Sequence, residues 1–368
     1  MRNSFRFFGR DIGGQGSDVY AALCSSLADD PDRARIVLRA APAFRSPLIL
    51  LAAVHHLLLT GTDDPLGAYY ATVAGNGAMP PDDRLYPTFA TFVDAHRAEL
   101  EAVVASNSTQ TNEARRTVIT LPALGMVASE GGRPLALVEV GASAGLNLPV
   151  DRYGYRIGSV PAGDAGSPVQ LECATVGALL PPVPTDLSVA WRLGVDLRPL
   201  DVRDAGTRDW LRALVWPEHR DRMALLDAAL DLARRDPPPL VTGDLTRDLP
   251  RLAADAPADA ALVVISTWVL AYVSDDGRRA FQASLGEIAM RRGAAVWLVA
   301  GEAQSVLASL QPGLTDPPAD GYGPSMLALL RFAPDGEATS RLLAECHAHG
   351  RWIRWLDEQS AVGSGERA

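Results

Sequence analysis

The chain contains no lysine, since all 34 of its basic residues are arginine. This absence excludes an enzyme that holds its substrate as a Schiff base on lysine, and it excludes the phosphate-binding loop whose lysine contacts a nucleotide. Cysteine is scarce too. Cys24, Cys173 and Cys346 lie far apart and are odd in number, so they indicate neither a disulfide framework nor a CxxC metal site. We therefore expect no bound metal.

Long apolar segments and an excess of positive charge are also missing. The longest apolar run, residues 47–60, is too short to cross a bilayer and contains His55 and His56. The first residues lack the apolar segment of a signal peptide. A net charge of −10 disfavours a protein dedicated to nucleic acid or acidic membranes. We expect a cytoplasmic protein with neither partner, and the sequence carries no signal for its oligomeric state.

The spacing of apolar residues divides the chain into two predicted domains. Residues 1–130 form an all-α domain, because apolar residues recur there every three or four positions and no convincing strand precedes Leu135. The tail, residues 359–368, is predicted to be disordered. The helices of the first domain are predicted at residues 18–28, 32–40, 47–59, 86–106 and 114–129.

Residues 131–358 alternate short β-rich runs with amphipathic segments, which is typical of a parallel sheet covered by helices. A late hairpin-like pair of strands is expected around a helical segment at residues 337–349. The insertion at residues 149–188 is rich in glycine and proline and is predicted as a long loop. The fold class is thus α/β, a Rossmann-like sheet of five parallel strands plus a C-terminal antiparallel pair. The predicted parallel strands are residues 135–140, 189–197, 240–242, 261–269 and 294–300, the pair is residues 326–332 and 351–355, and the helices are residues 207–216, 220–235 and 277–291.

The run LALVEVGASAGLNL holds the most informative turn of the chain. Glu139 followed by Gly141, Ser143 and Gly145 matches the acidic-x-Gly-x-x-x-Gly turn that binds S-adenosylmethionine. Glycines permit a sharp exit from the strand, and the amides of an ensuing helix would bind a carboxylate. A dinucleotide fingerprint is disfavoured because its second and third glycines are replaced by Ser143 and Leu146. A plain tight turn is the structural alternative.

The same turn also spells G-x-S-x-G, the nucleophile elbow of serine hydrolases, with Ser143 as the nucleophile. His347 or His349 could then complete a triad. Three features count against this alternative: the N-terminal third lacks strands, Pro149 ends the expected helix early, and both histidines are predicted inside a helix.

Other polar residues follow the predicted strands, where the carboxyl ends of parallel strands form one edge. Asp196 is placed to accept ribose hydroxyls, and Asp244 to face an adenine amino group. Ser266 completes the predicted cofactor set at the next strand end, where Trp268 offers an aromatic wall to a substrate. A solvated or turn aspartate and ordinary core packing of the tryptophan are the structural alternatives.

Two polar clusters flank the turn, and we predict that they contribute substrate-binding and catalytic groups. Glu113 and Arg116 are three residues apart and share one helix face, unless they only cap that helix. The predicted substrate-binding residues are Asn112, Arg116, Asn147 and Trp268, and the candidates for a base are Glu113, Asp151 and Tyr153.

Several longer runs of the sequence resemble one bacterial family. The runs TNEARR, LVEVGASAGLNLPVDRYGY, WRLGVDLRPLDV, WLRALVWPEHRDR and VVISTWVLAYV are similar to the family of domain of unknown function 2332. The resemblance covers residues from about Tyr20 to Trp355. It implies a fold like that of class I methyltransferases and gives weight to residues 139–151, but it implies no particular reaction.

The function that these patterns favour is a methyltransferase that uses S-adenosylmethionine and acts on a small molecule. Alignment of the reacting atoms is the main need of methyl transfer, so a dedicated base is optional. A serine hydrolase using Ser143 is the first alternative. A non-catalytic protein that retains the fold is the second.

Overall fold

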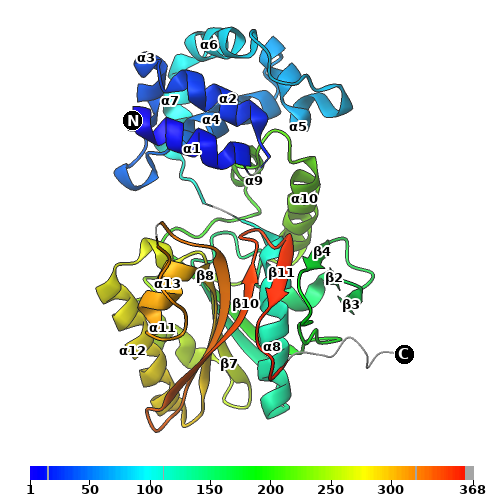
Figure 1. The fold of residues 1–368 in the computed structure, drawn as a ribbon, viewed down its shortest axis with the longest axis vertical. Coiled ribbons are helices and arrows are strands. Elements are labelled where there is room, and N and C mark those ends of the chain that lie inside the picture. The colour runs from blue at the N-terminus through cyan, green and yellow to red at the C-terminus, as the bar shows by residue number, and fades with distance from the viewer. Residues whose placement is uncertain (15, 111, 320, 361–368) are drawn as a thin grey trace. The chain divides into compact units, whose positions relative to one another are not determined.

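The structure, a computed structural model, describes residues 1–14, 16–110, 112–319 and 321–360 (Figure 1). Its contacts divide the chain into two units. Unit 1 comprises Met1–Asn112 and Asp201–Leu230, and unit 2 comprises Glu113–Leu200 and Asp231–Ala368. None of the helices in the described ranges has the length and apolar character that crossing a membrane requires.

Unit 1 is built from helices, and its described residues contain no strand. One apolar core joins the N-terminal helices to Trp210, Ala213 and Trp216 from the second segment of the unit. The helices are α1 (Arg2–Gly14), α2 (Asp18–Leu27), α3 (Pro31–Ala34), α4 (Pro47–Leu59), α5 (Ala71–Ala74), α6 (Leu85–Ala95), α7 (Arg97–Ser106), α9 (Ala205–Ala213) and the beginning of α10 (Arg220–Arg235).

The central helix of unit 1 is α4, with the sequence PLILLAAVHHLLL. Pro47 begins it at a position where the missing N–H costs nothing, and apolar residues surround the helix axis, so most of its side chains are buried. His55 is the polar exception. Its Nδ1 donates to the carbonyl of Ala213 at 3.1 Å and its Nε2 accepts from the hydroxyl of Thr72 at 2.7 Å, so both ring nitrogens are satisfied.

Unit 2 contains one sheet of eleven strands, most of whose pairings are parallel. The order is β3-β2-β4-β11-β10-β9-β8-β7-β1-β5-β6. The strands are β1 (Leu135–Val140), β2 (Gly154–Ile157), β3 (Val160–Gly163), β4 (Gln170–Thr175), β5 (Val189–Asp196), β6 (Leu240–Thr242), β7 (Ala261–Thr267), β8 (Val296–Ala303), β9 (Ser325–Phe332), β10 (Ala338–Cys346) and β11 (Trp352–Trp355).

Helices cover both faces of this sheet (Figure 1). On one face α12 (Asp275–Arg292) and α13 (Gln304–Leu310) pack on β8 and β9, and α11 (Leu249–Leu252) packs on α12. On the other face α8 (Thr117–Gly131) packs on β7, β8 and β9. Because side chains alternate along a strand, Val138 and Val140 enter the core with α12, whereas Glu139 points to the face of α8.

The mixed α/β class is confirmed, while the predicted number and pairing of the strands are wrong. The five predicted parallel runs correspond to β1, β5, β6, β7 and β8, whereas the expected C-terminal pair does not exist as such: β9 and β11 are separated by β10. The segment predicted as a helix at residues 337–349 is mostly β10, because pairing with β9 and β11 outweighs the helix propensity of its Leu, Ala and Glu residues.

The predicted loop at residues 149–188 contains three strands, β2, β3 and β4, and β4 joins the main sheet beside β11. The unit boundary also differs from the predicted one at residue 130, since α8 belongs to unit 2 and residues 201–230 belong to unit 1. The predicted disordered tail lies, from residue 361 on, outside the described residues.

No α-helix follows β1 directly. Residues 141–149 form consecutive turns, then comes the short 3-10 helix η6 (Val150–Arg152), and the chain enters β2. The expected helix start behind the glycine turn is therefore absent, and with it the argument that helix amides bind a carboxylate there. Pro149, predicted to end that helix, and Tyr153 lie instead in the segment that leads into β2.

Candidate functional site

The turn after β1 is held by β5. The amides of Gly141 and Ala142 donate to the carbonyl of Val195 at 2.8 and 3.2 Å, and the amide of Ser143 donates to Asp196 Oδ2 at 2.8 Å. Ser143 has φ of 51°, in the left-handed region that non-glycine residues rarely adopt. Strain of this kind persists where surrounding contacts enforce it, and it is concentrated at functional sites.

The glycines of the turn are required by packing inside the protein. Gly141 and Gly145 have φ of 67° and 71°. A Cβ on Gly141 would lie 2.3 Å from Val269 Cγ2, and one on Gly145 would lie 2.7 Å from Pro238 Cγ. Backbone conformation and these neighbours account for both glycines, so their presence is not in itself a sign of a cofactor.

Glu139 is the polar centre of the site. Its side chain is 2% exposed, and its Oε1 accepts a hydrogen bond of 2.7 Å from Asn147 Nδ2. Two acceptor atoms beside this bond, Glu139 Oε2 and Asn147 Oδ1, are buried without a hydrogen-bond partner. Burial raises the pKa of Glu139 to about 8, against the opposing effects of the Asn147 hydrogen bond and the Arg116 charge.

A second buried acid, Glu302, lies at the end of β8. Its Oε1 accepts from the hydroxyl of Ser266 at 2.6 Å and from the amides of Val269 and Leu270 at 3.0 and 3.2 Å. Its Oε2 is buried and has no partner, and burial raises the pKa of this carboxyl as well. Glu302 was not among the predicted site residues because the predicted strand stopped at residue 300, although only Gly301 separates the acid from the apolar run.

The donors to Glu302 flank Trp268, which has φ of 58°. Thus the two non-glycine residues with positive φ among the described residues, Ser143 and Trp268, lie in the turns that follow the neighbouring strands β1 and β7. The turns are in contact, since Val269 fills the space above Gly141. Trp268 Nε1 donates to Ser325 Oγ at 2.9 Å.

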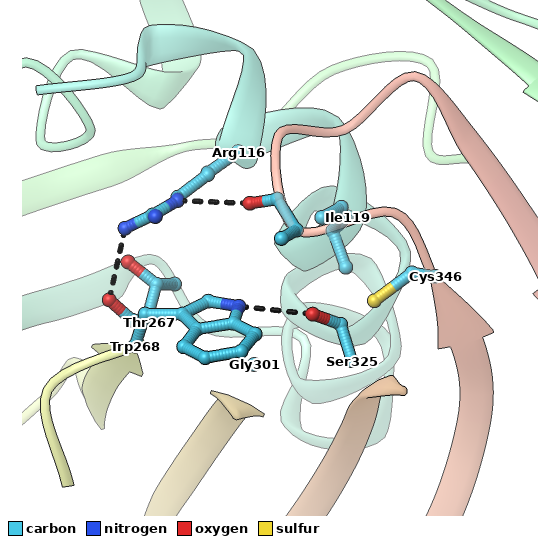
Figure 2. Close-up of a pocket in the computed structure, with 8 residues that line it drawn as sticks. Arg116, Ile119, Thr267, Trp268, Gly301, Ser325 and Cys346 are labelled. Atoms are coloured by element: carbon cyan, nitrogen blue, oxygen red, sulfur yellow. Dashed lines mark hydrogen bonds between the residues drawn. The ribbon is translucent and has the colours of Figure 1, made fainter. Parts of the chain in front are cut away.

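Arg116 connects these turns to the β10–β11 connection. Its Nη1 donates to the carbonyl of Thr267 at 3.2 Å and its Nε to that of Ala348 at 3.0 Å, as Figure 2 shows. Its charge lowers the pKa of both Glu139 and Glu302, in opposition to their burial. The charge of one arginine therefore partly offsets the effect of burial on the pKa of two carboxyls.

A small cavity lies between Arg116 and the ring of Trp268 (Figure 2). Its volume of about 10 Å³ suits roughly one water molecule. A larger ligand therefore requires the surrounding side chains to move. The lining residues are Arg116, Ile119, Thr267, Trp268, Gly301, Ser325, Cys346 and Ala348.

The predicted nucleoside contacts already have partners within the protein. Asp196 Oδ1 accepts from the amide of Arg198 at 2.8 Å, in addition to the bond from Ser143 to Oδ2. Asp244 Oδ1 accepts from the amide and the hydroxyl of Thr246 at 2.8 and 2.6 Å, and its Oδ2 lies 3.2 Å from Arg247 Nη2. These hydrogen bonds hold the pKa of Asp244 below its usual value.

Two of the three candidate bases are also engaged. Asp151 forms a bidentate ion pair with Arg192, with both contacts at 2.8 Å. The hydroxyl of Tyr153 donates to the carbonyl of Leu146 at 2.6 Å, and burial raises its pKa well above the usual value.

The third candidate base, Glu113, is buried and caps the 3-10 helix η5 (Ala114–Arg116) by accepting from the amide of Arg115. Its Oε2 lies 3.9 Å from His349 Nδ1. His347 and His349 follow β10 in a turn, so their predicted place inside a helix is wrong. The amide of His349 donates to His347 Nδ1 at 3.0 Å. Asn112, a predicted substrate contact, is the last residue of the first segment of unit 1.

Comparison with known proteins identifies the family. The chain belongs to the family described as "Uncharacterized protein conserved in bacteria (DUF2332)", whose model matches residues 2–355. None of the curated proteins compared with the chain matches it. A solved structure from work titled "Conversion of a Disulfide Bond into a Thioacetal Group during Echinomycin Biosynthesis" is 13% identical, covers 60% of this chain and 78% of its own, and has a TM-score of 0.24. A similarity this low carries no argument about function.

Proposed function

We propose that this member of the DUF2332 family is an S-adenosylmethionine-dependent methyltransferase that acts on a small molecule. The observation that carries the proposal is the buried carboxyl oxygen of Glu139, Oε2, which has no hydrogen-bond partner at the end of β1. β1 lies between β5 and β7, where the order of the parallel strands reverses. Ligands of open parallel sheets bind outside the carboxyl ends of the strands at such a point. The five strands β6-β5-β1-β7-β8 would then be the cofactor-binding sheet of a class I methyltransferase.

The residues at this point suit the cationic end of the cofactor. An ammonium group has three donors and no acceptor, and Asn147 Oδ1 together with Glu139 Oε2, once Glu139 has released its proton, offers two buried acceptors without a partner. Leaving each unsatisfied costs about 1–3 kcal/mol. S-adenosylmethionine, when bound, supplies an electrophilic methyl group. Ser143 and Ser266 border the same turns, and Trp268 offers an aromatic wall that excludes water.

Methyl transfer of this kind depends on alignment more than on proton removal. We assign no role as a base to Asp151 or Tyr153, because both are engaged within the protein. Glu113 remains the candidate base, since it is buried and faces His349 across 3.9 Å.

Isothermal titration of the full-length protein with S-adenosylmethionine and S-adenosylhomocysteine tests the proposal. Binding by the wild type is expected, with at least a tenfold loss in Glu139→Gln. Glu130→Gln is the matched control, since Glu130 is an acid on the exposed surface of α8. The absence of binding by folded wild-type protein would exclude the proposal. Binding without methyl transfer to any acceptor would favour a non-catalytic protein with the same fold.

A serine hydrolase is the second candidate, favoured by the left-handed backbone of Ser143 within a G-x-S-x-G turn. The position of His347 and His349 in a turn also suits a triad better than a helix does. Against it, Ser143 is 4% exposed and no α-helix follows the turn. Labelling by a fluorophosphonate probe that Ser143→Ala abolishes would support the hydrolase, and no labelling would dismiss it.

A further inference from the structure

The strand tips of unit 2 differ in whether their acids are available to a ligand. At β1, Glu139 and Asn147 share one hydrogen bond and each retains a buried oxygen without a partner. At β5, both oxygens of Asp196 accept backbone amides, and one of these bonds holds Ser143 in its strained conformation. A sugar hydroxyl that competed for Asp196 would weaken the turn to which the ligand binds.

The acid beyond β6 is engaged in the same way. Asp244 accepts two hydrogen bonds from Thr246 and faces Arg247. Each oxygen of the two acids that would hold a nucleoside therefore already has a partner within the protein, whereas Glu139 retains an oxygen that has none. Because an unsatisfied buried group gains most from a new partner, the largest share of binding energy is expected at Glu139 and Asn147.

The charge of Arg116 further selects among cations. This arginine acts electrostatically on Glu139, and the charge of Asp196 acts on the same carboxyl with the opposite sign. A bare amine placed against Glu139 would be repelled by the guanidinium. A zwitterion, with a carboxylate next to its ammonium group, is attracted by both Glu139 and Arg116.

We infer that the site is anchored on the α-amino-acid group of its ligand, and that the nucleoside part contributes little to affinity. This inference rests on the proposed function for the place of the site. It does not depend on the cofactor, since a free amino acid presents the same zwitterion.

The test uses four probes on the full-length protein: S-adenosylhomocysteine, L-methionine, 3-(methylthio)propylamine and 5′-methylthioadenosine. L-Methionine should bind at least tenfold more tightly than the propylamine, which lacks the carboxylate, and than methylthioadenosine, which lacks the amino acid. Glu139→Gln should lower the affinity for S-adenosylhomocysteine and methionine at least tenfold and leave that for methylthioadenosine unchanged. Glu130→Gln, at an exposed acid of α8, is the control that should alter none of these affinities.

Proton release gives an independent measurement. Glu139 retains its proton near neutral pH and must lose it to pair with an ammonium group, so titrations in buffers of different ionisation enthalpy should detect close to one proton released per ligand. If Glu139→Gln does not fold, Asn147→Ala should be measured in its place. It should show the same order of affinities among the four probes, with smaller losses of affinity than are expected for Glu139→Gln.

The possible outcomes separate the two proposals. Methionine binding without binding of S-adenosylhomocysteine would support the amino-acid anchor and reject the proposed cofactor. Equal affinities for methylthioadenosine and S-adenosylhomocysteine, with no effect of Glu139→Gln, would reject anchoring by the amino-acid group. The proposal that the protein binds S-adenosylmethionine would still stand. No binding by any probe would reject both.

Discussion

The two units bury their titratable groups in contrasting ways. In unit 1, His55 is fully buried and both of its ring nitrogens have hydrogen-bond partners. In unit 2, Glu139 is almost as deeply buried but one of its oxygens has none. The histidine completes a core, whereas the carboxyl leaves an interaction unmade. Burial alone thus does not distinguish a structural polar group from a candidate ligand contact; the unmade hydrogen bond does.

The same comparison predicts opposite responses to pH. Burial lowers the pKa of His55 to about 4 and raises that of Glu139 to about 8, so both groups are neutral in the folded protein near pH 7. Acid must therefore charge the histidine of unit 1, and base must charge the carboxyl of unit 2.

The largest expected effect is at Glu139. Unfolded glutamate ionises near pH 4.5, so between pH 4.5 and 8 the folded state holds a proton that the unfolded state has lost. The stability of unit 2 should fall across this window, by on the order of 5 kcal/mol. Hydrogen exchange of peptides covering residues 135–148 should report this loss in the wild type and not in Glu139→Gln. Parallel pH profiles of the two proteins would contradict the assignment.

A somewhat smaller effect is expected at His55. Unfolded histidine takes up a proton near pH 6.5, whereas the folded group does so only near pH 4. The stability of unit 1 should therefore be intact above pH 6.5 and fall by roughly 3 kcal/mol as the pH approaches 4. Exchange of α4 peptides should follow this trend, and His55→Gln should flatten it.

Substitutions of Glu302 distinguish whether this residue stabilises the turn after β7 through the hydrogen bonds that it accepts or through its charge. Glu302→Ala leaves the Ser266 hydroxyl and the Val269 and Leu270 amides without an acceptor, and it should cost about 2–3 kcal/mol. Glu302→Gln keeps an acceptor oxygen and should cost about 1 kcal/mol or less. Urea unfolding of both variants gives the values. Equal losses would show that the carboxylate charge, and not the accepted hydrogen bonds, stabilises the turn.

The smallest effect should come from Asp151, an acid of unit 2 whose charge is already paired. Asp151→Asn weakens the ion pair with Arg192, which is only about one-seventh exposed, and should cost roughly 1–2 kcal/mol in urea unfolding. Its affinity for S-adenosylhomocysteine should equal that of the wild type in calorimetry. A tenfold loss of affinity in Asp151→Asn would show that Asp151 contributes to ligand binding.

Local sequence patterns predicted the parallel strands well, because β1, β7 and β8 consist mostly of apolar residues and are buried along their whole length, as in a sheet covered on both faces. They failed where partners far along the chain decide the conformation. β10 has the residues of a helix but lies between two strands, and β4 reaches the main sheet only through β11. Likewise, the membership of Trp210 and Trp216 in the core of unit 1 depends on contacts that no local pattern encodes.

The structure brings several of the predicted site residues together, while their roles stay predictions. Glu139, Asn147, Ser143 and Trp268, which the strand ends indicated, lie at or around the adjoining turns after β1 and β7, and Arg116, indicated by a polar cluster on a predicted helix, donates to the end of β7. The internal partners of Asp196, Asp244 and Asp151 could not be foreseen, because they depend on side-chain directions across loops. Glu302 was missed through an error of three residues in the end of one strand.

Unit 1 is formed by two separate segments of the chain, and this affects the order in which the nascent chain can fold. Its core needs Trp210, Ala213 and Trp216, which the ribosome makes about a hundred residues after Asn112. At roughly 5–20 residues per second, the N-terminal helices wait on the order of 5–20 s for those side chains. Meanwhile β1 emerges before β5 and β7, its two neighbours in the sheet. Both units of the nascent chain therefore expose apolar surface together, and neither can complete its folding before the other has begun.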